Sequence, residues 1–85
     1  MTAPKVLMYA TDWCPYCERA RSLLSGKGVA FEEIDIDAVT GAREEMVARS
    51  GRDTVPQIFI GGQHVGGSDE LQTLDAAGRL DSMLK

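Results

Sequence analysis

The chain has 85 residues, of which 44% are hydrophobic and 26% charged, and its formal net charge is −4. This length and balance are typical of one small globular domain, here residues 1–85, with a modest hydrophobic core. The negative charge gives no electrostatic support for nucleic-acid binding, and no apolar run approaches the roughly 20 residues of a membrane-spanning helix. Because residues 1–5 do not resemble the apolar part of a signal peptide, we expect a cytoplasmic, reducing location.

Apolar periodicity and turn residues predict strands and helices that alternate along the chain. The expected strands cover residues 5–10, 29–37, 57–60 and 63–65. The expected helices cover residues 15–27, 40–50 and 69–77, followed by a short helical turn over 80–84. Thr40 and Ser68 are the predicted caps of the second and third helices, and Met46 and Val47 are expected to face the core.

The order of these elements predicts how the strands pair. A helical crossover between the first two strands makes them parallel, and the Gly61-Gly62 turn makes the last two antiparallel. The result is an α/β fold with the order β-α-β-α-β-β-α, in which helices flank a mixed four-stranded sheet on both faces. This is the thioredoxin-like fold.

Two cysteines, the only ones in the chain, lie at the predicted junction between the first strand and the first helix. Pro15 suits the first position of a helix, so Cys14 falls at the cap and Cys17 within the first turn, with both sulfurs on one face. A helix N-terminus stabilises a thiolate and lowers a cysteine pKa from about 8.5 toward roughly 3.5–7.5. This pattern predicts a redox-active dithiol in which Cys14 attacks and Cys17 resolves.

Two structural roles for the cysteine pair compete with this interpretation. A zinc site needs about four ligands, and His64 is the only other soft candidate, so we expect no metal. A structural disulfide is typical of small secreted scaffolds, which usually carry several pairs. Pro15 also favours a helix start over a zinc-binding turn.

Three motifs together resemble those of the glutaredoxin family, and the resemblance covers essentially the whole chain. They are Cys14-Pro15-Tyr16-Cys17, Thr54-Val55-Pro56-Gln57 and Gly66-Gly67-Ser68-Asp69. The small bacterial dithiol members are the most similar. The resemblance implies a glutathione-dependent oxidoreductase that reduces protein–glutathione mixed disulfides and protein disulfides. Glutathione would serve as co-substrate and reductant, with no tightly bound cofactor, and we expect a monomer.

The resemblance also implies where glutathione binds. Pro56 would be cis and face the dithiol, and the backbone of Val55 would pair with an extended substrate. The γ-glutamyl carboxylate would meet the N–H groups of Ser68 and Asp69, and its ammonium would meet the Asp69 side chain. The full implied glutathione site is Tyr16, Thr54, Val55, Pro56, Gly67, Ser68 and Asp69. The simpler alternatives are a trans proline at a strand start and plain helix capping by Ser68 or Asp69.

Several neighbouring residues carry open interpretations. Thr11 stands where similar proteins often have a lysine, and Arg52 could replace that charge or be a solvated loop residue. Asp12 would oppose a very low thiol pKa. Trp13 is either a substrate contact or a packed core residue. His64 is expected at the surface, without a role as a base.

Two other functions compete with the oxidoreductase. An iron–sulfur cluster carrier of similar fold would share a cluster between two subunits, but Pro15 after the first cysteine argues against it. A protein-recognition module with an idle disulfide would bind a partner equally well when reduced or oxidised, and it would show no turnover.

Overall fold

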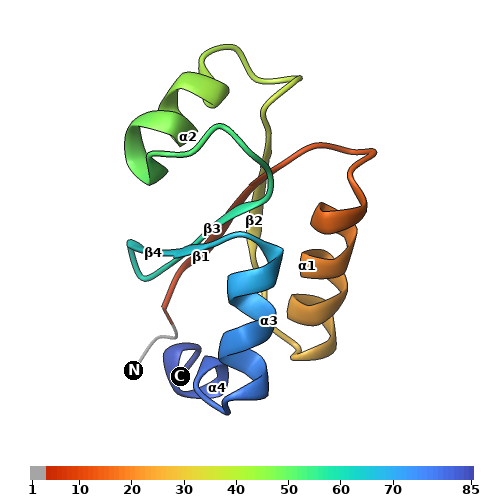
Figure 1. Cartoon of the computed structure of the whole chain (residues 1–85), viewed down its shortest axis with the longest axis vertical. Coiled ribbons are helices and arrows are strands. Elements are labelled where there is room, and N and C mark those ends of the chain that lie inside the picture. The colour runs from red at the N-terminus through yellow and green to blue at the C-terminus, as the bar shows by residue number, and fades with distance from the viewer. Residues whose placement is uncertain (1–3) are drawn as a thin grey trace.

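The computed structural model describes residues 4–85, which fold as a sheet with helices on both faces (Figure 1). The strands are β1 (Val6–Ala10), β2 (Glu32–Asp35), β3 (Gln57–Ile60) and β4 (Gln63–Gly66). The helices are α1 (Pro15–Gly26), α2 (Ala42–Ser50), α3 (Ser68–Ala76) and α4 (Leu80–Met83). Within the described residues, no helix is long and apolar enough to cross a membrane.

The sheet has the strand order β2-β1-β3-β4. The strand β1 runs parallel to β2 and antiparallel to β3, and β3 pairs antiparallel with β4. The predicted mixed four-stranded sheet is therefore confirmed. Because β1 and β3 are antiparallel, the end of β1 and the start of β3 lie at the same edge of the sheet.

Each face of the sheet has its own apolar core, because successive side chains of a strand point to opposite faces. Met8 and Ile58 face α1 and α3, where they pack in one cluster with Leu24 and Leu71. On the opposite face, Tyr9 and Phe59 pack with Ile36, Ala42 and Met46 beneath α2. Figure 1 shows α1 and α3 beside each other and α2 apart from them, across the sheet.

The second strand is shorter than the predicted range 29–37. Its early residues are tied to the end of α1, since the Val29 N–H donates to the Leu24 carbonyl at 3.2 Å. Its late residues turn away, since the Asp35 carboxylate accepts the N–H groups of Asp37 and Ala38 at 2.9 and 3.3 Å. Only the four residues between these two turns remain in β2.

Both predicted helix caps are wrong. Gly41, in the left-handed conformation with φ of 80°, caps α2, so Thr40 lies outside the helix. Gly67 caps α3, and Ser68 is the first residue of the helix. The prediction for Val47 is also wrong: this side chain is 39% exposed, whereas Met46 is buried as expected. The remaining predicted boundaries differ by one residue, as at the end of α1, or agree.

Candidate active site

The two thiols lie where the sequence places them. Cys14 is the cap residue of α1, with extended backbone, and Pro15 is the first residue of the helix. Cys17 lies in the first turn and is fully buried, whereas Cys14 is half-buried.

The surroundings of the two sulfurs give them different acidities. Burial acts against ionisation of Cys14, but hydrogen bonds from the backbone and thiol of Cys17, the backbone of Tyr16 and the positive charge of Arg21 outweigh it. The pKa of Cys14 is therefore lowered. Burial raises the pKa of Cys17 to about 11, although a hydrogen bond with the Thr11 backbone works in the opposite direction. Cys14 is thus the thiol that ionises first, and only the thiolate is nucleophilic.

The loop before β3 reaches the nucleophilic thiol. The Val55–Pro56 peptide bond is cis, as the family resemblance implied. The Cys14 Sγ lies 4.0 Å from the carbonyl oxygen of Val55. The loop therefore presents a backbone edge beside the sulfur that would carry a substrate.

A groove with a volume of about 250 Å³ lies next to this loop, and it collects all seven residues that the sequence assigned to glutathione. Its lining also includes Arg52, Gln57 and Glu70. The Thr54-Val55-Pro56 and Gly67-Ser68-Asp69 segments face each other here. A side chain at Gly67 would bring its Cβ within 3.3 Å of the Pro56 carbonyl oxygen, so glycine lets the two segments approach.

The start of α3 forms one wall of this groove. The first amides of a helix have no acceptor within the helix, so this end can bind an anion. Ser68 does not cap the helix with its side chain, because its hydroxyl instead accepts a hydrogen bond from Gln72 at 2.9 Å. Plain capping by Ser68 is therefore wrong.

Glu70 is a groove residue that the sequence interpretation missed. Its Oε1 accepts the Gly67 N–H at 2.8 Å and the Arg52 guanidinium at 2.6 Å. These two partners, the Gly67 amide first, lower the pKa of Glu70. At Gly66, which has a φ of 125°, any Cβ would lie 2.5 Å from the same oxygen. A glutamate at the third position of a helix is a capping signal that could have revealed this contact.

Arg52 is a paired residue of the groove and not part of the thiol site. Its side chain is 47% exposed, pairs with Glu70 and lines the groove, so it is a loop charge in contact with solvent that also belongs to the groove. Thr11, where similar proteins often have a lysine, is buried and carries no charge.

The aromatic residues around Cys14 are exposed. Trp13 is 80% exposed and Tyr16 is 54% exposed, so the alternative that Trp13 packs in the core is wrong.

His64, expected at the surface, is half-buried: its Nε2 shares a hydrogen bond of 2.7 Å with Gln57, and its ring lies 5.0 Å from that of Phe59. Burial lowers the pKa of His64.

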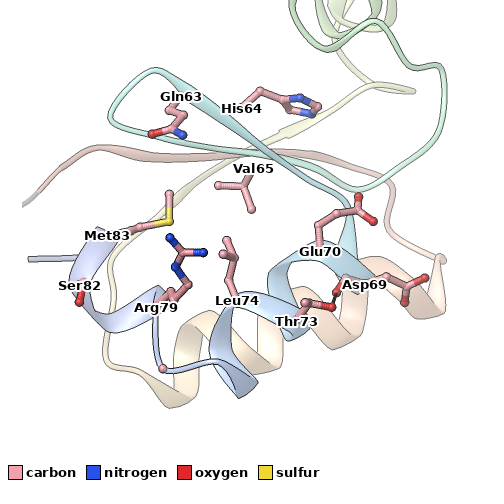
Figure 2. A pocket seen from close by; sticks show the side chains of 11 residues that line it. Gln63, His64, Val65, Asp69, Glu70, Thr73, Leu74, Arg79, Ser82 and Met83 are labelled. Carbon is pink, nitrogen blue, oxygen red and sulfur yellow. Dashed lines mark hydrogen bonds between the residues drawn. The ribbon is translucent and has the colours of Figure 1, made fainter.

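A second hollow, of about 770 Å³, lies between β4, α3 and α4 (Figure 2). Val65, Leu74 and Met83 form its apolar part, and Asp69 and Glu70 stand at the end nearest the groove. It contains neither thiol. Across residues 4–85, no three His, Cys, Asp or Glu side chains are grouped so that they could hold a metal ion.

Thiol–disulfide exchange is favoured by an accessible thiol that ionises readily and a second thiol close to it. A thiol of lowered pKa at Cys14, followed by Cys17 on the same helix beside a mixed four-stranded sheet, is the arrangement of a thiol–disulfide oxidoreductase of the thioredoxin-fold class. The family model described as Glutaredoxin matches residues 6–65. The chain belongs to the glutaredoxin family, which confirms the resemblance seen in its motifs.

Comparisons with individual proteins also give glutaredoxins. The chain is 59% identical to Glutaredoxin 3 of Escherichia coli (strain K12) over 80 residues, which cover 94% of this chain and 96% of that protein. The solution structure of a Brucella melitensis glutaredoxin is 52% identical, has a TM-score of 0.87 and covers 100% of this chain and 92% of its own. A buckwheat glutaredoxin, solved in complex with glutathione, is 28% identical with a TM-score of 0.89, covering 95% of this chain and 76% of its own.

Proposed function

We propose that this protein uses glutathione to reduce protein–glutathione mixed disulfides and protein disulfides, with Cys14 as nucleophile and Cys17 as resolving thiol. The observation that carries the proposal is the unequal acidity of the two thiols beside a groove that ends in a helix N-terminus. Burial raises the pKa of Cys17 to about 11, whereas the pKa of Cys14 is lowered. Of the two thiols, the more accessible Cys14 therefore ionises first as the pH rises.

With a mixed disulfide, the Cys14 thiolate attacks the glutathione sulfur. The protein thiolate leaves and takes up a proton, and Cys14 now carries glutathione. The thiolate of a second glutathione then attacks the sulfur of the bound glutathione, so that glutathione disulfide leaves and the Cys14 thiolate returns. Cys17 is not needed in this cycle.

With a protein disulfide, Cys14 attacks one sulfur and the other leaves as a thiol after protonation. Cys17 loses its proton and attacks the Cys14 sulfur, which releases the substrate as a dithiol and leaves a Cys14–Cys17 disulfide. Two glutathione molecules then restore both thiols and become glutathione disulfide. The spacing of the cysteines on one helix face favours this second step.

In the glutathione complex we propose, the tripeptide lies in the groove with its sulfur at Cys14. Its cysteinyl backbone pairs with the Val55 backbone, as an added strand does. Its γ-glutamyl carboxylate meets the amides of Ser68 and Asp69, and its ammonium meets the Asp69 carboxylate. Tyr16, Thr54, Pro56 and Gly67 form the walls. The buckwheat glutaredoxin, which was solved in complex with glutathione, supports glutathione as the ligand.

The positive charge along the groove has a matching role in this proposal. Arg52, held by Glu70, would face the glycyl carboxylate of glutathione. The pairing leaves the guanidinium with further N–H donors, since Arg has five. Glutathione is a co-substrate in this scheme, no bound cofactor takes part, and the protein acts as a monomer in a reducing, cytoplasmic setting.

The test is turnover of a small glutathione mixed disulfide, followed through NADPH consumption by added glutathione reductase. We expect turnover that depends on glutathione and saturates with the mixed disulfide. Turnover with a generic dithiol but none with glutathione would contradict the proposal. A brown protein with visible absorbance after anaerobic purification would instead favour the cluster-carrier alternative.

A further inference from the structure

Arg21 lies on the same face of α1 as the two thiols. Cys14, Cys17 and Arg21 are spaced i, i+3 and i+7, which places them along one stripe of the helix. The Arg21 side chain is only 18% exposed, although it carries a full charge. A mostly buried guanidinium needs partners for its donors, and those partners show what it does.

One set of partners comes from β2. The Nε and Nη2 of Arg21 donate to the two carboxylate oxygens of Glu33 at 2.8 and 2.7 Å. This is a two-bond fork, the geometry in which arginine pairs most strongly with a carboxylate. Glu18, on the next turn of α1 after Cys14, stands farther from the guanidinium, at 3.6 Å.

The other partner is the segment that leads into the active site. The Arg21 Nη2 also donates to the Thr11 carbonyl at 2.8 Å. Thr11 is buried, and its backbone is the largest influence that acts against the raised pKa of Cys17. The guanidinium therefore holds a piece of backbone that affects the acidity of Cys17.

We propose that Arg21 is a positioning residue for the dithiol: it fixes the Thr11 backbone against Cys17, its charge acts on both sulfurs, and Glu33 offsets part of that charge. This inference rests on the proposed roles of Cys14 and Cys17. The charge of Arg21 lowers the pKa of each thiol, in agreement with its place on the stripe. The charged groups that face it are Glu33 on β2 and Glu18 on α1, and the exposed Asp12 precedes Cys14 by two residues in the chain.

Two substitutions distinguish the proposal from a purely structural role, because the proposal predicts that they shift the pKa of Cys14 in opposite directions. If the Arg21–Glu33 pair only braces α1 against β2, removing either partner loosens the same site in the same direction. If the Arg21 charge acts on the thiols, Arg21→Gln makes Cys14 less acidic. In that case Glu33→Gln, which leaves the Arg21 charge unopposed, makes Cys14 more acidic.

The experiment measures the rate of Cys14 alkylation by iodoacetamide between pH 4 and 9, with mass mapping of both cysteines, for the full chain. We expect Arg21→Gln to slow alkylation below neutral pH by about threefold or more, and Glu33→Gln to accelerate it by a similar factor. Arg21→Lys should recover most of the rate, since it keeps the charge. Both shifts should shrink in high salt.

Glu32→Gln is the matched control. Glu32 precedes Glu33 on β2 and loses the same charge, but it pairs with the exposed Lys5 at 3.3 Å and makes no contact with Arg21. We expect its alkylation profile to match that of the unchanged protein. Circular dichroism confirms that each variant is folded before its rates are compared.

Shifts of Arg21→Gln and Glu33→Gln in the same direction, or profiles of both that match the unchanged protein, would overturn the inference. The proposed function fails by a different result: equal alkylation of Cys14 and Cys17 below neutral pH in the unchanged protein. The two failures are therefore distinguishable in one data set.

Discussion

The Cys14 sulfur and the Val55 carbonyl oxygen lie 4.0 Å apart, although the two residues are 41 positions apart in the chain. The pairing of β1 with β3 produces this contact. Because the two strands are antiparallel, the chain leaves β1 toward Cys14 at the same edge where the Val55 loop enters β3. In the proposed complex, a substrate held at Cys14 would therefore lie beside the Val55 backbone, which would align the substrate chain.

Asp69→Ala tests the placement of the γ-glutamyl group. The substitution removes the proposed partner of the ammonium, a hydrogen bond to a charged group worth roughly 1.5–3 kcal/mol. We expect KM for a glutathione mixed disulfide to rise roughly ten- to a hundredfold, with the alkylation rate of Cys14 unchanged. Asp75→Ala is the matched control, since it lies on the same helix and pairs with Lys27 outside the groove. An unaltered KM in a folded Asp69→Ala variant would mean that Asp69 only stabilises the start of α3 and does not bind glutathione.

Glu70→Gln tests how the start of α3 is held. The carboxylate accepts the Gly67 amide and pairs with Arg52, and both contacts lower its pKa, so it stabilises the fold when ionised. A carboxylate whose pKa is lower in the folded than in the unfolded state adds to the free energy of unfolding at pH values above its unfolded-state pKa. That stabilisation is lost as the pH falls through the folded-state pKa. Solvent screens this half-exposed pair, so we expect Glu70→Gln to lower the free energy of unfolding by about 1 kcal/mol at pH 7.

Urea denaturation at several pH values measures this difference. The gap between the unchanged protein and Glu70→Gln should narrow as the pH falls below the ordinary glutamate range near about 4.3. A gap that stays constant down to pH 2 would show that the carboxylate charge does not stabilise the helix start.

Trp13→Ala tests whether this side chain contacts protein substrates but not small ones. The side chain is 80% exposed, so its removal should leave the free energy of unfolding almost unchanged. An exposed aromatic ring next to the nucleophile can contact the polypeptide around a target disulfide. We expect kcat/KM for a protein disulfide to fall about threefold or more and that for a small mixed disulfide to stay level, with Trp13→Phe close to the unchanged protein. Equal effects on both substrates would argue against a polypeptide contact.

Tyr9→Phe tests what holds α2 to the sheet. The Tyr9 ring is fully buried, and its hydroxyl donates to Glu45 and accepts from Arg49 on α2. Burial, with the Glu45 contact, raises the pKa of Tyr9, so the hydroxyl stays a donor at neutral pH. Its loss should cost about 1–2 kcal/mol of unfolding free energy and leave turnover unchanged, because the hydroxyl's partners Glu45 and Arg49 do not line the groove. Val47→Ala, exposed on the same helix, is the control; a stability change as large as that of Tyr9→Phe would refute the specific contribution of the hydroxyl.

The parts of this protein that were predictable from its sequence are those encoded by nearby residues. The order of the elements and the Gly61-Gly62 turn predict the mixed sheet with helices on both faces, and Pro15 predicts where α1 begins. The groove was predictable because its residues belong to motifs shared with a known family, although their contacts with glutathione remain predictions.

The parts that were not predictable depend on contacts between distant segments. The extent of β2 is set by which acceptors the amides on either side of it find. The Arg21–Glu33 fork joins residues 12 positions apart, and the Arg52–Glu70 pair joins residues 18 apart. Charged side chains carry little information about their partners until the sheet and helices are packed, so both pairs read as ordinary surface charges in the sequence.

The most direct test of the central claim measures two activities of Cys14→Ser and Cys17→Ser: turnover of a glutathione mixed disulfide and reduction of a protein disulfide. The proposed roles predict that Cys14→Ser loses both activities. Cys17→Ser should keep turnover of the mixed disulfide and lose reduction of a protein disulfide that needs a resolving thiol. Loss of both activities in a folded Cys17→Ser variant, or activity of either kind in Cys14→Ser, would contradict the division of labour between the two thiols.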